Sequence, residues 1–278
     1  MAANPVGGGA IFTHEAITVQ QTKRGCYQEM CGCEAKSEYR VYPGHVEQGQ
    51  PRAEGIPQIG HLLEDSGFLI RLCCADMRGF TMKLAAGDKP AGEPGAGPVQ
   101  AVYEKPFSFP IYGKMYIPTD SDIIKVNFPC CCFLPSVDTK TPDGRKVGSS
   151  RYICDLHPFV PAFEVLDEPG RVMYYVRPDT CCCDQCITCT CCGGSAGNGC
   201  IFTPFYIRDP ITKQPVPSAF GPERPAEIRK VWSGFKKECC TDADNFHVIF
   251  PAGASEEVKM NLLGTNMLID FSWFETQA

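Results

Sequence analysis

The sequence lacks a long apolar run and a secretory leader. No window of 18 or more residues is apolar enough to indicate a clear membrane span. The chain begins MAANPVGGGA, which has neither the charged n-region nor the apolar h-region of a signal peptide. It also lacks the Met-Gly start that N-myristoylation requires. We therefore expect a protein that is not secreted.

An excess of positive charge and the common catalytic motifs are also missing. The chain has 26 Lys and Arg against 32 Asp and Glu, a formal net charge of −6. Nucleic-acid binding usually needs a basic face, so we predict no nucleic-acid partner. There is no Gly-rich phosphate loop, no GxSxG and no HExxH. The sequence therefore does not favour an enzyme.

Cysteine, by contrast, is abundant, with 19 residues that mostly come in clumps. The clumps are Cys26–Cys33, Cys73–Cys74, Cys130–Cys132, Cys181–Cys192 and Cys239–Cys240. Disulfide frameworks belong mostly to short secreted chains, and adjacent cysteines rarely pair because the geometry is strained. We interpret most of these cysteines as reduced thiols in a cytosolic compartment.

The 27 glycines and 24 prolines divide the chain into short segments that favour strands and turns. Apolar and polar residues alternate within many of them, as at Phe80, Met82 and Leu84. The predicted strands are Ala16–Gln20, Tyr39–Tyr42, Phe68–Leu72, Phe80–Leu84, Val99–Tyr103, Ile111–Ile117, Ile123–Phe128, Arg151–Leu156, Ala162–Leu166, Val172–Val176, Phe202–Ile207, Ile228–Val231 and Phe246–Phe250. About a dozen strands at this spacing indicate an all-β barrel or sandwich.

The domain organisation predicted from composition is simple. Residues 1–10 form a flexible N-terminal segment, and residues 11–278 form one domain. Stretches near 45–57, 86–98 and 210–225 are polar or rich in Gly and Pro, so we expect them to be loop insertions between strands.

One helix is predicted, from about Ser255 to Glu275. Ser255 is suited to cap its N-terminus, and Glu256 and Glu257 give an acidic first turn. Apolar residues surround most of its circumference, which is typical of a helix buried in a core or a membrane. The central set comprises Met260, Leu263, Met267, Phe271 and Phe274.

Two features of this helix favour a protein core over lipid. The stretch 260–274 would reach only about 22 Å at ~1.5 Å per residue, short of a ~30 Å hydrocarbon layer. Asp270 would cost several kcal/mol in lipid. We expect the helix to be threaded through a β-barrel.

Three C-terminal stretches carry a resemblance to a known family. They are KVWSGFKKECC at Lys230–Cys240, TDADNFHVIFP at Thr241–Pro251 and EVKMNLLGTNMLIDFSWFE at Glu257–Glu275. In the phospholipid scramblase family, they are similar to the strand that carries a Trp before the signature, to the DADNF signature itself and to the terminal helix. The resemblance implies a mainly β, closed Tubby-like barrel of about 12 strands around a hydrophobic C-terminal helix.

The same resemblance implies a function. It is ATP-independent, Ca²⁺-stimulated movement of phospholipids between the leaflets of a membrane, a transport process with no covalent catalysis. The implied location is the cytosolic face of a plasma or organelle membrane. The alternative is a non-catalytic structural or interaction subunit of a larger assembly that retains the scramblase fold.

The implied calcium site begins at Asp242, Asp244 and Asn245, whose oxygens are ligands that Ca²⁺ prefers. The family has an acidic residue eleven positions after Asp242, where this chain has Gly253. Glu256 and Glu257 would have to replace it, which requires the loop to bend. The other interpretation of Asp242 and Asp244 is a turn in which their side chains cap backbone N–H groups.

The cysteines offer two further sites. Cys130, Cys131 and Cys132 follow a proline and resemble the family's palmitoylation cluster, so palmitoyl groups are expected there; a buried Cys-rich strand is the other interpretation. Overlapping CxxC pairs suit zinc or an iron–sulfur cluster, although the segment lacks two separated knuckles and zinc is less favoured than reduced structural thiols. These candidate metal ligands are Cys183, Cys186, Cys189 and Cys192.

Overall fold

The computed structural model describes the main body of the chain. The described ranges are 11–22, 36–45, 55–67, 78–108, 112–118, 123–129, 133–154, 160–181, 186–187, 204–231 and 245–274. The predicted N-terminal segment 1–10, most of the predicted loop 45–57 and the predicted strand Phe68–Leu72 lie outside them.

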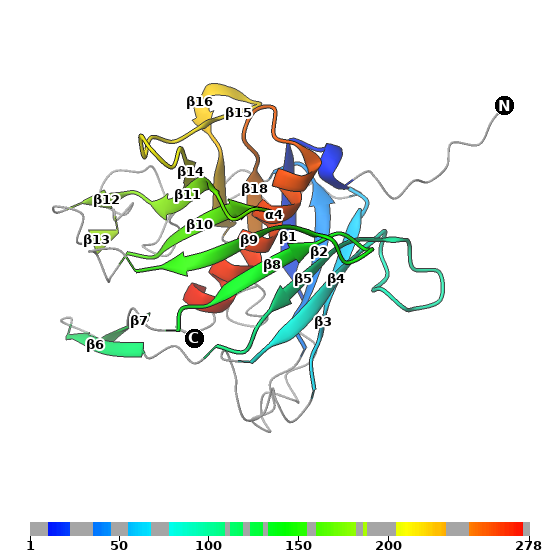
Figure 1. Ribbon diagram of the computed structural model, residues 1–278, viewed down its shortest axis with the longest axis horizontal. Helices are drawn as coiled ribbons and strands as arrows, with labels where there is room; N and C mark the ends of the chain where they lie inside the picture. Colours follow the sequence, from blue (N-terminus) through cyan, green and yellow to red (C-terminus); the bar gives the residue numbers. More distant parts are fainter. Residues whose placement is uncertain are drawn as a thin grey trace.

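Twelve antiparallel strands form a closed barrel (Figure 1). Its order is β1-β18-β17-β14-β11-β10-β9-β8-β5-β4-β3-β2, with β2 returning to β1. The bounds are β1 Ala16–Gln21, β2 Glu38–Pro43, β3 Gly60–Asp65, β4 Phe80–Ala86, β5 Val99–Lys105, β8 Ser136–Lys140, β9 Lys146–Ile153, β10 Ala162–Asp167, β11 Val172–Pro178, β14 Pro204–Arg208, β17 Glu227–Val231 and β18 Asn245–Ile249. The predicted fold class, a closed β-barrel with one C-terminal helix, is confirmed.

Three small two-stranded sheets lie outside the barrel order. They pair β6 (Tyr112–Pro118) with β7 (Ile123–Pro129), β12 (Thr180–Cys181) with β13 (Cys186–Ile187), and β15 (Pro217–Ser218) with β16 (Gly221–Pro225). The third pair lies within 210–225, which was predicted as a loop. The stretch predicted as a loop at 86–98 holds turns and bends between β4 and β5.

Alternation along each strand separates an apolar barrel interior from a more polar outside. In β4, Phe80, Met82 and Leu84 are buried, whereas Thr81 is half-buried and Lys83 is exposed. This is the period-2 pattern expected when one face of an antiparallel sheet covers a core. The inward residues of the barrel strands form one cluster together with residues of the C-terminal helix.

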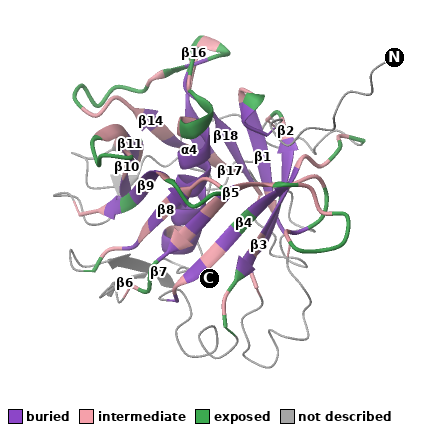
Figure 2. Ribbon diagram, turned by 45° about the vertical axis from the view of Figure 1, so that its right-hand side comes forward, coloured by how far each residue is buried: buried purple, intermediate pink, exposed green. Residues whose placement is uncertain are grey.

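The helix α4 (Glu256–Ile269) fills the barrel, and a π-helical turn η4 (Asp270–Phe274) continues it. The predicted N-cap is confirmed, because the Ser255 hydroxyl oxygen accepts a hydrogen bond of 3.3 Å from the Val258 backbone N–H. Every residue from Lys259 to Ile269 is buried. Figure 2 shows the helix buried among the strands, as the apolar circumference predicted.

The direction of α4 defines the two ends of the barrel, which we call the α4-N end and the α4-C end. At the α4-N end, Glu257 forms an ion pair with Arg145 in the β8–β9 connection. At the α4-C end, Phe271 packs on Phe80 at the start of β4, with ring centroids 4.5 Å apart. A short 3₁₀ turn, η1 (Ile11–Thr13), contacts α4 and precedes β1, which begins at the α4-N end.

The cysteines are distributed unevenly among the connections between the barrel strands. Six connections leave the α4-C end: β1–β2, β3–β4, β5–β8, β9–β10, β11–β14 and β17–β18. In sequence, all 19 cysteines fall within these six connections, and the connections at the α4-N end contain none. In sequence, the cysteine clumps therefore all lie in connections that start and finish at the same end of the barrel.

Candidate functional site

The predicted central-helix residues lie inside the barrel. Met260, Leu263, Met267 and Phe271 are all buried and belong to the single apolar cluster. Phe274 ends η4, and its side chain lies outside the described residues. Among the helices of the described ranges, none combines the length and the apolarity that crossing a bilayer would require.

Polar side chains fix how α4 sits in the barrel. Asn261 accepts a hydrogen bond of 2.9 Å from the Thr139 hydroxyl, and its own N–H donates to the Leu166 carbonyl at 2.8 Å. Thr265 and Ser150 join their hydroxyls at 2.7 Å. Because buried polar groups are costly when unpaired, these bonds select one rotation and one height of the helix.

Two glycines let the helix approach the wall this closely. A Cβ added to Gly148 in β9 would lie 2.3 Å from the Leu166 carbonyl oxygen and 2.5 Å from Nδ2 of Asn261. One added to Gly264 would lie 2.9 Å from the Thr139 hydroxyl oxygen. The packed helix therefore depends on small residues at its contact with β8 and β9.

One polar side chain on α4 remains unsatisfied. Asn266 is fully buried, and neither its Nδ2 nor its Oδ1 has a hydrogen-bond partner among the described residues. One helical turn further on, Asp270 accepts a hydrogen bond of 2.6 Å from the Tyr39 hydroxyl. Asn266 and Asp270 therefore add buried polar groups to the interior, beside those of Asn261 and Thr265.

A buried ion pair lies inside the barrel at its α4-C end. Arg78 and Glu64 are both buried, and Arg78 Nε lies 2.8 Å from Glu64 Oε1. Burial alone would raise the pKa of Glu64, but hydrogen bonding and the charge of Arg78 hold that pKa below its usual value. The Arg78 guanidinium also lies 5.5 Å from the Phe271 ring centroid. The last turn of the helix is thus held against a charged, fully bonded cluster.

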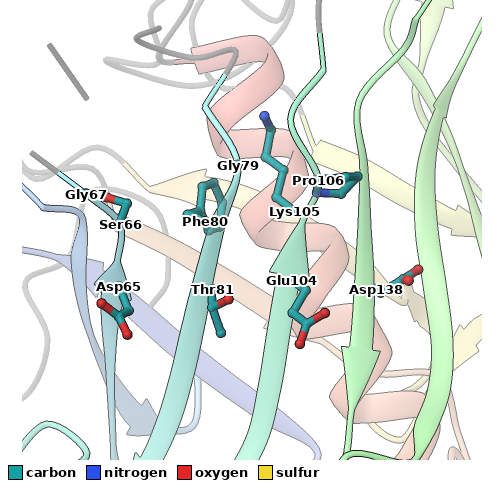
Figure 3. Close-up of a pocket in the computed structure, with 10 residues that line it drawn as sticks. All are labelled: Asp65, Ser66, Gly67, Gly79, Phe80, Thr81, Glu104, Lys105, Pro106 and Asp138. Carbon is teal, nitrogen blue, oxygen red and sulfur yellow. The ribbon is translucent and has the colours of Figure 1, made fainter. Parts of the chain in front are cut away.

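Beside this ion pair, the outer surface of β3, β4, β5 and β8 is hollowed into a polar pocket of about 430 Å³ (Figure 3). Asp65, Thr81, Glu104 and Asp138 follow one another directly across the four strands. Neighbouring lysines neutralise two of these carboxylates, because Lys140 Nζ lies 2.5 Å from Glu104 and Lys146 Nζ lies 2.8 Å from Asp138. In Figure 3, Lys105, which follows Glu104 at the end of β5, extends toward the α4-C end of the barrel.

Among the predicted calcium ligands that the structure describes, Asn245 and the two glutamates lie at opposite ends of β18. Asp242 and Asp244 lie outside the described residues, and Asn245 begins β18 at the α4-C end. Glu256 and Glu257 begin α4, beyond the other end of β18, about 16 Å away along a strand that rises ~3.3 Å per residue. The structure therefore does not bring the two glutamates next to Asn245.

The predicted cysteine sites fall largely outside the described part of the chain. This applies to Cys130, Cys131, Cys132, Cys183, Cys189 and Cys192, whereas Cys186 is described only as a backbone position in β13. Among the residues whose side chains are described, no group of three or more His, Cys, Asp or Glu is placed to hold a metal. Cys154 forms a disulfide, so it is an exception to the reduced-thiol interpretation that was made for most of the cysteines.

A second buried charged group lies on the outer face of β17 and β18. Glu227 Oε1 lies 2.5 Å from the Arg229 guanidinium and 3.2 Å from Nε2 of His247. Burial alone would raise the pKa of Glu227, but hydrogen bonding from His247 and the charge of Arg229 hold that pKa below its usual value. In the sequence, this cluster is indicated by polar residues that alternate with apolar ones. Glu227 and Arg229 flank Ile228 in β17, and His247 lies between Phe246 and Val248 in β18.

This cluster predicts an acid sensitivity with a definite sign. Because the folded pKa of Glu227 is depressed, its contribution to stability is complete above the ordinary glutamate pKa of 4.5 and is lost as the pH falls through the folded pKa. We expect Glu227→Gln to reduce the loss of unfolding free energy between pH 6 and about pH 3.5. Urea unfolding at each pH measures this, with the exposed Glu256→Gln as control. Equal acid dependence of wild type and Glu227→Gln would contradict it.

Similarity to known proteins agrees with this architecture. Residues 200–276, which run from β14 through η4, match the protein family described as Scramblase. Mouse phospholipid scramblase 1 is 32% identical over 150 residues, covering 53% of this chain and 37% of the mouse protein. Human phospholipid scramblase 2 is 26% identical over 214 residues, covering 76% of this chain and 55% of its own length. The family match and these relatives support the phospholipid scramblase family for this chain.

Human phospholipid scramblase family member 5 is similar over a shorter range, with 28% identity over 162 residues and 50% of its length covered. No solved structure matches the chain. The chain spans about a third to just over half the length of the curated relatives described here. The matched region 200–276 includes β18, which closes the barrel by pairing with β1, and α4, which fills it.

Proposed function

We propose that this protein moves phospholipids between the leaflets of a membrane, without ATP and with stimulation by Ca²⁺. The observation that carries the proposal is the family match over residues 200–276, the part of the chain that closes and fills the barrel. The relatives that match over more of the chain are themselves called phospholipid scramblases. Such movement breaks no covalent bond, so the proposal requires no catalytic set of residues.

The test is lipid movement in vesicles that contain the full chain and a fluorescent phospholipid. A membrane-impermeant reductant bleaches only the outer leaflet, so lipid transfer appears as bleaching beyond the level of protein-free vesicles. We expect this excess with the protein present and without ATP, and a larger excess after Ca²⁺ is added. Bleaching equal to that of protein-free vesicles in both arms would favour the alternative, a structural or interaction subunit.

For the calcium dependence, we propose Asp242 and Asp244 as ligands, with Asn245 beside them at the α4-C end. Hard cations bind carboxylate and carbonyl oxygens, and these three residues supply such oxygens within one four-residue segment, 242–245. Asp242→Asn with Asp244→Asn is therefore expected to remove the Ca²⁺ stimulation. The matched control is Glu256→Gln with Glu257→Gln, because the structure places these glutamates at the α4-N end.

We further propose that Cys130, Cys131 and Cys132 are palmitoylated and anchor the protein to the cytosolic face of a membrane. Each buried CH₂ of an acyl chain adds about 0.8 kcal/mol, and stable anchoring generally takes two signals. We expect the triple change Cys130→Ala, Cys131→Ala and Cys132→Ala to move most of the protein from the membrane fraction to the supernatant of lysed cells. Unchanged membrane recovery would argue against acylation at these residues. Cys73→Ala with Cys74→Ala is a control at another cysteine pair.

A further inference from the structure

The side-chain amide of Asn266 lies inside the barrel without a protein partner. Asn266 is fully buried in α4, and neither its Nδ2 nor its Oδ1 has a hydrogen-bond partner among the described residues. Asn261, on the same helix, bonds both Thr139 and Leu166. Buried polar side chains almost always have a partner, because an unpaired amide is strongly unfavourable in an apolar interior. This position therefore calls for a bound molecule as the partner of the amide.

A buried carboxylate lies one helical turn further on. The Asp270 N–H donates to the Asn266 carbonyl, so the two residues are in helical register, and side chains four residues apart on a helix are neighbours. Asp270 is 0% exposed, and its Oδ2 accepts a hydrogen bond of 2.6 Å from the Tyr39 hydroxyl of β2. A carboxylate has about four lone-pair sites, so Asp270 can accept further bonds beside that of Tyr39. Asn266 and Asp270 thus present adjoining polar groups to the same part of the interior.

The barrel wall adds Gln21 beside Tyr39. Gln21 of β1 lies directly opposite Tyr39 of β2. Because alternate residues of a strand share a face, Gln21 lies on the same side of β1 as the core residues Ile17 and Val19. It is 9% exposed where β1 ends, at the α4-C end of the barrel. Polar side chains therefore continue from Asn266 toward that end.

The spacing of Asn266 and Asp270 suits one bridging molecule of the size of water. Side chains at this separation on a helix have Cβ atoms about 5–6 Å apart. A water molecule that makes two hydrogen bonds of about 2.8 Å each spans a similar distance. The helix also changes to π geometry at Asp270, and π turns often accompany functional sites.

The number of polar groups favours water over a metal ion. Zinc takes about four protein or water ligands and Ca²⁺ about six to eight, whereas this interior offers one carboxylate, one amide oxygen and the Tyr39 hydroxyl. A buried water molecule needs only about two to four polar partners. The Asn266 amide can both donate to such a molecule and accept from it.

We propose that an ordered water molecule is bound inside the barrel, between the Asn266 amide and the Asp270 carboxylate, at a site that Tyr39 and Gln21 border. The water donates one hydrogen bond to Asp270 and makes another with the Asn266 amide. The packed interior around α4 is then hydrated at one place, and the carboxylate on the helix keeps part of its solvation. This inference goes beyond the proposed function and does not depend on it.

The first measurement is water contact in the purified full chain labelled with ¹⁵N-asparagine. The chain has six asparagines, so the Asn266 side-chain signal can be assigned by its loss in Asn266→Leu, or in Asn266→Ser if the leucine variant does not fold. We expect a nuclear Overhauser cross-peak between water and the Nδ2 protons, with the sign of a dipolar contact and not of chemical exchange. The Asn261 amide, which bonds the protein directly, is the control and should show none. An Asn266 signal without water contact in wild type would overturn the proposal.

The second measurement is urea unfolding of Asn266→Leu. With water bound, the substitution removes one of its partners and leaves Asp270 in apolar surroundings, so the unfolding equilibrium constant should rise about tenfold. In a dry interior the same substitution removes an unpaired amide, and the constant should fall. Thr265→Val, whose hydroxyl bonds Ser150 at 2.7 Å, is the control: it should raise the constant but leave the water contact of Asn266 unchanged. An unfolding constant for Asn266→Leu that is equal to or below that of wild type would overturn the proposal.

Discussion

Replacing Arg78 with alanine is expected to lower the free energy of unfolding by roughly 3–5 kcal/mol, because it leaves the carboxylate of Glu64 buried without its countercharge. Arg78 is 2% exposed and Glu64 is not exposed at all. The guanidinium also bonds Ser37 and packs over the Phe271 ring, so its loss loosens the last turn of the helix. Urea unfolding monitored by circular dichroism at neutral pH measures the difference.

An exposed ion pair provides the control. Arg151 bonds Glu164 on the barrel surface, and its side chain is 52% exposed. Arg151→Ala should cost at most about 1 kcal/mol, since solvent screens an exposed pair. Restoring the balance with Arg78→Met and Glu64→Gln together should recover part of the loss, because no charge is then buried alone. Equal costs for Arg78→Ala and Arg151→Ala would contradict the assignment of a buried, structural ion pair.

Truncating Phe271 to alanine is the second change with a large expected effect. The ring is 1% exposed, lies 4.5 Å from the Phe80 ring and fills the barrel where α4 passes into η4. Removing a buried Phe typically costs about 3–5 kcal/mol, from lost burial and from the cavity that remains. The same unfolding measurement, extended to thermal unfolding, tests this value.

Phe107 offers a matched comparison at the same end of the barrel. It is the same residue type but 58% exposed, so Phe107→Ala should change the unfolding free energy by no more than about 0.5 kcal/mol. A small effect of Phe271→Ala would mean that the barrel collapses around the missing ring. The helix would then not be the rigid centre that its buried contacts indicate.

The sequence predicted the strands whose inward residues are apolar and missed those whose inward residues are polar. The strands β4 and β18 alternate clearly and lie within a residue or two of their predicted bounds. Gly60–Asp65 and Ser136–Lys140 were not predicted, because Glu64 and Thr139 occupy inward positions. Those two polar residues are the ones that bind Arg78 and the helix residue Asn261.

The helix was predictable, but its attachments were not. A capping serine and an apolar circumference locate α4 from local sequence alone. The partners of Asn261 and Thr265 come from β8, β9 and β10, more than 90 residues earlier in the chain. No local pattern encodes such pairings. The same holds for the separation of Asn245 from Glu256, which are close in sequence but lie at opposite ends of one strand.

The closure of the barrel has a consequence for synthesis. The first strand, β1, pairs with the last, β18, and the helix that fills the interior follows β18. A growing chain therefore has eleven barrel strands made before the closing strand β18 and the helix α4 are available, so the apolar inner faces of those strands stay uncovered until β18 and α4 have been made. A stop codon ahead of β18 would leave an open, hollow sheet, and the nascent protein should depend on chaperones until β18 and α4 have been made.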